Sequence, residues 1–160
     1  MVVFHSLSKR SNLPGLRSGF LATGPENLKR LSQLKSYGGA PLPKPLQYAA
    51  AAVWKDEEHV KENRKLYAAK YKLSDDIMSG LAGYSSPEAG FFLWIKVRDS
   101  EKTTLDLWRE TGVRVLPGAY LAQEKNGKNP GQDFIRVALV AQQKITEEAL
   151  TKIRFFLEKQ

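Results

Sequence analysis

A lysine and an arginine flank a short polar segment near the start of the sequence, Lys9 before it and Arg17 after it. A lysine amine attacks a carbonyl carbon once burial or a neighbouring cation lowers its pKa and frees its electron pair. An arginine guanidinium can donate two parallel hydrogen bonds to a phosphate. The hydroxyls of Ser6 and Ser8, just before the lysine, are candidates for further phosphate contacts. The segment could therefore combine an amine nucleophile with a phosphate site.

A third charged side chain, Arg136, lies inside the apolar run 134–140. A charge in a buried strand requires a partner, and a substrate carboxylate is a natural one if the side chain faces a cleft. Each candidate also has a simpler explanation. Lys9 and Arg17 could be solvated surface residues, the serines could end a strand, and Arg136 could point to water from an edge strand.

The apolar pattern and the chain breakers predict the elements that carry the first three candidates. We expect a short buried strand over 2–5, a loop over 6–17 that is rich in Ser, Asn, Pro and Gly, and a second strand over 19–23. A helix should begin around Pro25, and the prolines of the segment 37–45 should interrupt the helical pattern. An Ala-rich, buried helix is expected over 46–54.

The rest of the chain predicts a long amphipathic helix followed by a compact α+β arrangement. The long helix should run over 57–81. Strands are expected over 90–97, 113–116 and 134–140, and a surface turn over 123–132. A helix over 103–111 should turn Leu105 and Trp108 inward, and Thr146 should cap the last helix.

Composition limits the classes of protein to consider. A length of 160 residues suits one domain or a piece of a larger one, and 42% apolar residues suffice for a core. No cysteine is present, which excludes a disulfide scaffold and a cysteine-based metal site, and we assign no metal-binding residue. No apolar run is long enough to span a membrane, so a cytoplasmic protein is the default. The net charge of +8 is scattered among acidic residues, which favours an anion site or a basic part of a larger protein over nucleic-acid binding. We interpret His5 and His59 as structural.

Taken together, the segments 6–9 and 14–20 resemble the cofactor-lysine signature of the class I/II aminotransferases, which are enzymes of fold type I that depend on pyridoxal 5′-phosphate (PLP). The break at 37–43, the long helix and the segments 90–92, 115–118 and 134–138 follow in the family's order, so that the resemblance covers nearly the whole chain. Within the family, the sequence looks most like the bacterial N-succinyldiaminopimelate aminotransferases of lysine biosynthesis. Other branches that use amino acids or diaminopimelate share much of the pattern.

The resemblance implies an α/β fold, the C-terminal part of a PLP-dependent transferase. Residues 1–36 would be an incomplete edge of the large, PLP-binding domain and would carry the cofactor-lysine loop. Residues 37–82 would form the interdomain linker and long helix, and residues 83–160 the small C-terminal α+β domain. The segment 37–40 would approach the active site of a partner subunit, which implies a homodimer or a higher oligomer.

The resemblance also assigns roles to the candidate residues. Lys9 matches the catalytic lysine that binds PLP covalently and later moves a proton at the substrate Cα. Arg17 matches the arginine that binds the cofactor phosphate, and Ser6 and Ser8 match hydroxyls near that phosphate. Arg136 matches the arginine that holds the α-carboxylate of the substrate. The substrates would be an amino acid, such as N-succinyldiaminopimelate or glutamate, and a 2-oxo acid.

The sequence departs from the family in its length. A complete member is much longer, and its upstream half supplies the Gly-rich turn near the phosphate, the aromatic residue that stacks on the cofactor ring, and the aspartate that pairs with the pyridine nitrogen. We therefore expect these 160 residues to be a C-terminal fragment that is inactive alone. The alternative is a non-catalytic binding or assembly module, or one half of a split enzyme that requires a separate N-terminal chain.

Overall fold

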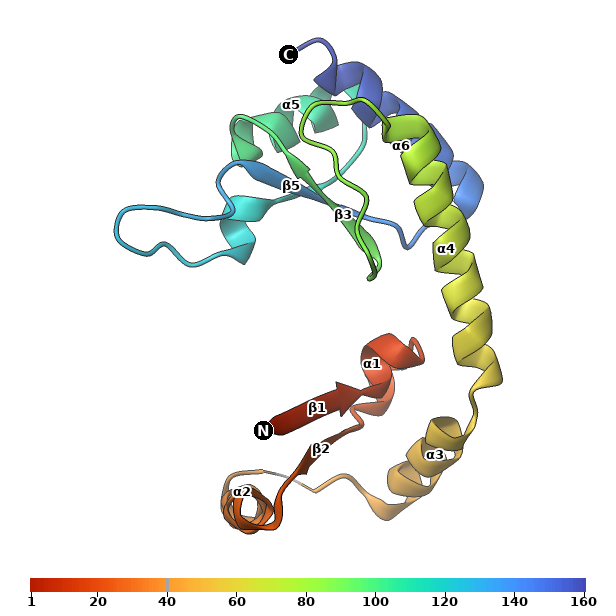
Figure 1. Ribbon diagram of the computed structural model, residues 1–160, viewed down its shortest axis with the longest axis vertical. Coiled ribbons are helices and arrows are strands. Elements are labelled where there is room, and N and C mark those ends of the chain that lie inside the picture. Colours follow the sequence, from red (N-terminus) through yellow and green to blue (C-terminus); the bar gives the residue numbers. More distant parts are fainter. Residues whose placement is uncertain (40) are drawn as a thin grey trace. The chain divides into compact units, whose positions relative to one another are not determined.

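Two compact units make up the chain in the computed structural model, which describes residues 1–39 and 41–160. The first unit comprises Met1–Arg64 and the second Lys65–Gln160. The boundary falls inside the long helix α4 (Glu58–Met78), so that each unit contains part of this helix (Figure 1). Each unit has a sheet of its own.

The first unit is built on two antiparallel strands, β1 (Val2–Ser6) and β2 (Gly19–Thr23). The segment between them forms a short helix, α1 (Leu7–Arg10), and a 3-10 turn, η1 (Pro14–Leu16). Proline suits the start of such a turn because its φ is already fixed near the helical value. Part of the predicted loop is thus helical.

Two helices complete the first unit, α2 (Pro25–Gly38) and α3 (Lys44–Lys55), and each has a proline in its first turn. Trp54, near the end of α3, packs edge-on against rings from both strands. Its ring centroid lies 5.2 Å from that of His5 and 4.9 Å from that of Phe20. This aromatic cluster holds the end of α3 against β1 and β2.

The predicted positions of these elements are confirmed, but two predictions of burial are wrong. The strand over 2–5 is exposed, with Phe4 72% accessible, and Ala50 is the buried residue of α3. Apolar character shows that a side chain is suited to burial, and it does not show that a neighbour lies against it. The segment 37–45 does interrupt the helical pattern, although Ala40, within it, lies outside the described residues.

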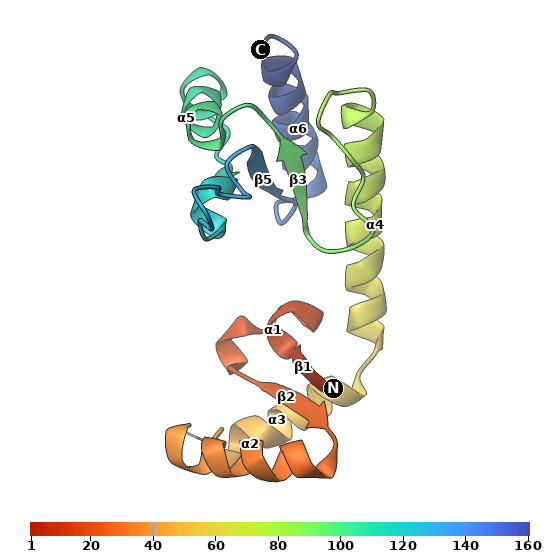
Figure 2. The same ribbon diagram turned by 60° about the vertical axis from the view of Figure 1, so that its left-hand side comes forward.

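The second unit contains three antiparallel strands in the order β3-β5-β4. They are β3 (Phe92–Lys96), β4 (Leu116–Pro117) and β5 (Phe134–Ala138), with a 3-10 turn, η2 (Gly118–Leu121), directly after β4. Two helices, α5 (Ser100–Thr111) and α6 (Gln143–Leu157), lie beside this sheet together with the end of α4 (Figure 2). This arrangement confirms an α/β fold with a compact second unit.

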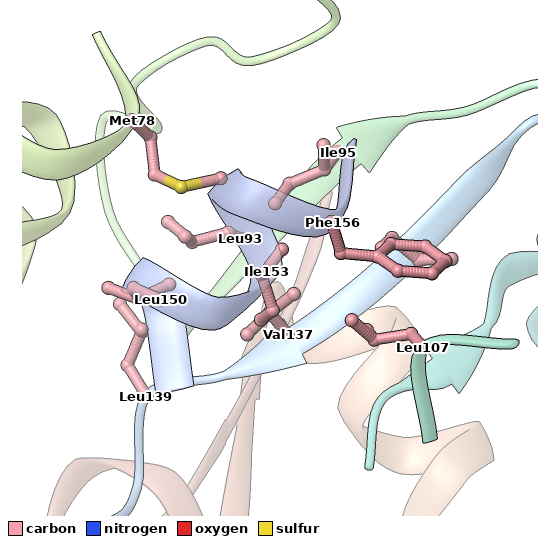
Figure 3. Close-up of a cluster of buried hydrophobic side chains, with 10 residues drawn as sticks. Met78, Leu93, Ile95, Leu107, Val137, Leu139, Leu150, Ile153 and Phe156 are labelled. Atoms are coloured by element: carbon pink, nitrogen blue, oxygen red, sulfur yellow. The ribbon is translucent and has the colours of Figure 1, made fainter. Parts of the chain in front are cut away.

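The core of the second unit forms between one face of the sheet and these helices. Leu93 and Ile135 alternate along β3 and β5 with residues of the opposite face, as the period of two in a strand requires. Ile153 of α6 points toward the sheet and lies above Val137 (Figure 3). The complete cluster consists of Met78, Leu93, Ile95, Leu107, Ile135, Val137, Leu139, Leu150, Ile153 and Phe156.

Several predictions for the second unit are wrong in detail. The strand expected over 113–116 comprises only Leu116–Pro117. Leu105 and Trp108 are exposed, because α5 turns Leu107 into the core instead. Thr146 does not cap the last helix, which begins earlier at Gln143. It is buried inside α6, and its hydroxyl donates to the carbonyl of Gln142 at 3.1 Å. No helix in the described part of the chain combines the length and apolar content needed to cross a membrane.

Candidate active site

Lys9 lies in α1, directly after the strand β1, and it is exposed. Ser6 begins this helix, because its Oγ accepts a hydrogen bond from the backbone N–H of Ser8 at 3.1 Å. A serine in this position typically stabilises a helix start by about 1 kcal/mol. The hydroxyl proton of Ser6 can still be donated to a ligand. The serine therefore shapes the lysine turn and can also bind an anion.

Arg17 lies at the end of η1 in the left-handed conformation, with φ 51° and ψ 33°. This conformation costs a non-glycine residue about 1 kcal/mol or more, and such residues gather at ligand sites. The side chain is exposed and curls back, and its Nη1 donates to the carbonyl of Pro14 at 2.8 Å. The guanidinium is thereby held near the turn that carries it.

Gly19, in the segment 14–20, lies where β1 and β2 approach each other closely. A Cβ atom at this position would lie 2.6 Å from the carbonyl oxygen of His5. The absence of a side chain allows β1 and β2 to approach, and Gly19 pairs with Ser6 in the sheet. The N–H of Leu7 also donates to the carbonyl of Ser18 at 3.1 Å. These contacts bring the backbone that follows Arg17 back to the end of β1, where α1 begins.

The first unit thus places four predicted residues, Ser6, Ser8, Lys9 and Arg17, on the connection between two paired strands. An amine, a guanidinium fork and two hydroxyls match the needs of a ligand that has a carbonyl and a phosphate group. The chemistry of this donor set therefore fits PLP.

Arg136 belongs to the second unit, and it pairs with Trp94 across β5 and β3. Its side chain lies on the sheet face opposite the core. The guanidinium carbon lies 5.7 Å from the centroid of the Phe91 ring and 4.5 Å from that of Phe92. Its Nε atom is buried and has no hydrogen-bond partner among the described residues.

This environment suits a carboxylate ligand. A buried N–H without an acceptor costs about 1–3 kcal/mol, which an incoming carboxylate would recover. The aromatic walls stabilise the cation and lower the local dielectric constant, so that an ionic hydrogen bond formed there is strengthened. The chemistry of the Arg136 guanidinium therefore allows a carboxylate ligand, and that role stays a prediction.

Phe91 and Phe92 are not among the site residues predicted from the sequence. Adjacent aromatic residues at the start of a strand were a possible signal. Their contact with Arg136, however, depends on the pairing of Phe92 with Ala138, two residues further along β5. That register is a property of the folded sheet. Sequence reasoning also gave no role to Arg10, which the first unit buries beside Lys9.

Comparison with known proteins gives a family match over most of the chain. Residues 1–153 match the model of the family described as aminotransferase class I and II. An aminotransferase from Neisseria meningitidis superposes with a TM-score of 0.88 at 40% identity, over 95% of this chain and 39% of that one. A probable N-succinyldiaminopimelate aminotransferase from Thermus thermophilus gives a TM-score of 0.81 at 29% identity, over 97% and 41% of the two chains.

A relative of a different described activity is also similar. The 4-dedimethylamino-4-oxo-anhydrotetracycline transaminase of Streptomyces rimosus is 32% identical over 143 residues, which are 88% of this chain and 38% of the relative. The chain therefore spans about two-fifths of the length of the proteins that it matches.

Proposed function

Since this chain belongs to the class I and II aminotransferases, we propose that it contributes the lysine and the carboxylate fork of a PLP-dependent transaminase. The reaction moves an amino group from an amino acid to a 2-oxo acid. Enzymes of this family generally depend on PLP and use such substrates. The proposal concerns the roles of Lys9, Ser6, Ser8, Arg17 and Arg136.

Four of these residues would hold the cofactor, and one of them would also act on the substrate proton. PLP, when bound, supplies an electron sink for the charge left on the substrate Cα. Lys9 would be the residue that holds the cofactor at its carbonyl group, and its amine, when free of the cofactor, would hold and move the proton of the substrate Cα. Arg17 would hold the phosphate through its guanidinium, with the hydroxyls of Ser6 and Ser8 as further donors.

The environment of Arg136 is the observation that carries the proposal. Its buried, unpartnered Nε and its two aromatic neighbours fit a ligand carboxylate, and every amino acid and 2-oxo acid has one. A carboxylate held by a planar fork is fixed in orientation as well as in position. This fixes the neighbouring Cα, at which the proton is removed.

For the amino donor, we propose an N-acylated diaminopimelate such as N-succinyldiaminopimelate, with glutamate as the other amino acid of the exchange. The likeness to the Thermus thermophilus structure supports this choice. The Streptomyces relative shows that similar sequences also occur in a transaminase described for another substrate. Substrate assays therefore need to include both acidic and bulky amino donors.

We further propose that turnover requires more polypeptide than these 160 residues, and that the complete enzyme is a homodimer. The share of the relatives that the chain covers supports the first part of this proposal, and the homodimer is what the family resemblance implies. The second candidate function is an assembly module, including one half of a split enzyme. Exposed apolar side chains of the first unit favour it, and among them Phe4, Tyr37 and Tyr48 are the most accessible after Met1.

Reductive trapping tests the proposed cofactor site. The chain is incubated with PLP and then with borohydride, and the modified lysine is located by peptide mass spectrometry. We expect modification to concentrate on Lys9, to disappear in Lys9→Ala and to persist in the control Lys29→Ala, which alters an exposed lysine of α2. Arg17→Gln should weaken trapping with PLP but not with pyridoxal, which lacks the phosphate.

The same experiment can refute the proposal. Modification spread evenly over the surface lysines would show that Lys9 has no cofactor site of its own. Such a result would favour the assembly module. A stable complex with a separately made N-terminal part of a relative that gains transaminase activity would instead identify a split enzyme.

A further inference from the structure

Arg10, the residue after Lys9, points away from solvent into the end of α3. Its side chain is only 9% accessible. Its guanidinium donates to the backbone carbonyls of Val53 at 3.2 Å, Asp56 at 3.3 Å and Trp54 at 3.4 Å. It also forms an ion pair with Glu57 and lies 5.0 Å from the ring centroid of Trp54.

These contacts supply hydrogen-bond donors to backbone carbonyls that the end of a helix otherwise leaves without a partner. The last carbonyls of a helix lack intrahelical donors, and they carry the negative end of the helix dipole. A planar guanidinium can serve several of them at once, which the single ammonium of a lysine cannot do with the same geometry. Arg10 therefore caps α3 and also ties α1 to it.

A second chain of hydrogen bonds joins the same two segments. The Oγ of Ser11 lies 2.9 Å from His59 Nε2, and His59 Nδ1 lies 2.8 Å from a carboxylate oxygen of Asp56. Arg10 Nη1 also donates to Ser11 Oγ at 3.2 Å. With the Nδ1 proton donated to the carboxylate, Nε2 accepts the proton of the Ser11 hydroxyl. Both attachments therefore converge on the turn that follows Lys9.

Hydrogen bonds connect Ser11, His59 and Asp56 in the same order as the residues of a hydrolase catalytic triad, but the surroundings of Ser11 exclude that role. Ser11 is only 9% accessible, and its oxygen is already the acceptor of the Arg10 hydrogen bond. A nucleophile needs an open path to the carbonyl carbon that it attacks. The three residues therefore attach one segment of the chain to another.

We propose that Arg10 is a positioning residue that holds the turn of Lys9 on the end of α3, with Ser11 and His59 as the second attachment. The inference rests on the proposed role of Lys9. Successive residues of a helix point about 100° apart, so that fixing the Arg10 side chain in one direction fixes the direction of the neighbouring lysine. A four-residue helix such as α1 is too short to hold that orientation by itself.

Hydrogen exchange and reductive trapping test this inference on the full chain. In Arg10→Gln, we expect amide exchange over residues 7–17 to accelerate by about tenfold or more. We also expect trapping of PLP on Lys9 to slow by about tenfold. Arg10→Lys should restore only part of the amide protection and of the trapping rate, because lysine supplies the positive charge but not the planar set of donors of a guanidinium. The matched control is Arg30→Gln, which removes an exposed arginine of α2 in the same unit.

Ser11→Ala is the milder variant if Arg10→Gln does not fold, and it should change both measurements in the same direction by a smaller factor. Local acceleration together with slower trapping would support the inference. Unchanged exchange, unchanged trapping, or acceleration spread evenly over residues 1–64 would overturn it. If wild-type Lys9 traps no PLP, the proposed function itself fails. If Lys9 traps PLP equally well in the Arg10→Gln variant, only the positioning role fails.

Discussion

The guanidinium carbon of Arg136 lies 4.5 Å from the centroid of the Phe92 ring, on the face of the sheet opposite the core. The ring of Phe91 lies 5.7 Å from the same carbon. Aromatic faces stabilise a cation by about 0.5–2 kcal/mol, but they do not replace an acceptor in the plane of the guanidinium. The arginine is therefore supported in position while its Nε stays without a hydrogen-bond partner among the described residues.

Replacing this arginine should separate stability from ligand binding. In Arg136→Met, an incompletely paired and only partly buried charge gives way to an apolar side chain of similar length. We expect the free energy of unfolding of the second unit to stay within about 1 kcal/mol of wild type or to rise. Binding of a 2-oxo acid should be lost. Thermal unfolding measures the first effect, and NMR chemical-shift changes on adding 2-oxoglutarate measure the second.

Arg98→Met is the matched control, because Arg98 is exposed in the same unit. This control should retain 2-oxo acid binding. The interpretation of Arg136 as a carboxylate site would be contradicted if Arg136→Met retained binding. A loss of more than about 2 kcal/mol in the free energy of unfolding would show a structural role instead.

Two glycines of the second unit approach each other too closely to accept side chains. A Cβ at Gly118 would overlap the carbonyl oxygen of Gly131 and lie 2.6 Å from that of Phe134, and a Cβ at Gly131 would overlap the carbonyl of Gly118. Gly118→Ala should therefore lower the free energy of unfolding by about 3 kcal/mol. Chemical denaturation measures this change.

The control for that substitution is Gly127→Asn in the neighbouring turn. Gly127 has φ +72° with open space around it, and asparagine tolerates this conformation. The control should cost no more than about 1 kcal/mol. Equal effects of the two substitutions would show that close approach of the backbone does not set the requirement for glycine at position 118.

The sequence was sufficient to predict most of the longer helices and strands, because periodicity and chain breakers act locally, but it did not predict the short helix α1. The apolar run 134–140 predicts β5, and the spacing of apolar residues over 57–81 predicts α4. Burial was harder to predict, because it depends on neighbours that are distant in sequence. Phe4 is apolar but exposed, and Trp108 is also exposed, with the guanidinium carbon of Arg114 lying 5.1 Å from its ring centroid.

The candidate site was predictable to a similar degree. The types and spacing of Lys9 and Arg17 indicate their chemistry, and the roles themselves stay predictions. The contacts of Arg10 with the carbonyls that end α3 were not predictable, because they join residues more than forty positions apart. His59 was interpreted as structural from its charged surroundings. Its hydrogen bond to Ser11 arises only when α1 and the start of α4 come together.

Tyr84 should contribute stability that is lost in alkali. Its hydroxyl donates to Asp75 at 2.6 Å, and burial, followed by this hydrogen bond, raises the pKa of Tyr84 above its usual value. The folded state therefore retains the phenol proton, whereas an unfolded tyrosine ionises near about pH 10. The stability that the protonated Tyr84 hydroxyl contributes below that pH should be lost as the pH rises toward the pKa of Tyr84 in the folded state.

Tyr84→Phe should lower the free energy of unfolding at neutral pH by about 1–2 kcal/mol, because it removes a hydrogen bond to a carboxylate. It should also reduce the loss of stability in alkali. Denaturant titrations at several pH values measure both effects. Tyr48→Phe, at an exposed tyrosine of α3, should leave them unchanged. An unaltered alkaline profile in Tyr84→Phe would refute the assignment.

Asp56 should make the first unit sensitive to acid. Its hydrogen bond to His59, followed by that from the backbone N–H of Glu58, lowers the pKa of the Asp56 carboxyl below its usual value of about 3.8. A carboxyl whose pKa is lower in the folded than in the unfolded state stabilises the folded state at pH values above the unfolded-state pKa. This contribution is lost as the pH falls through the folded pKa. The acid limb of unfolding should therefore begin below about pH 4.

Asp56→Asn should remove this part of the acid dependence and should also loosen the turn that contains Ser11, because the asparagine no longer provides a charged acceptor for His59. NMR spectra of the amides of residues 1–64, recorded between neutral pH and acid, follow both effects. Asp76→Asn, at an exposed position of α4 in the second unit, provides the control and should leave these amides unchanged. If the hydrogen bonds from Asp56 through His59 to Ser11 transmit the protonation of Asp56, the NMR signal of the Ser11 amide should shift as Asp56 is protonated. If Asp56→Asn has the same acid transition as wild type, the hydrogen bonds through His59 and Ser11 do not couple the Asp56 carboxyl to the turn that contains Lys9.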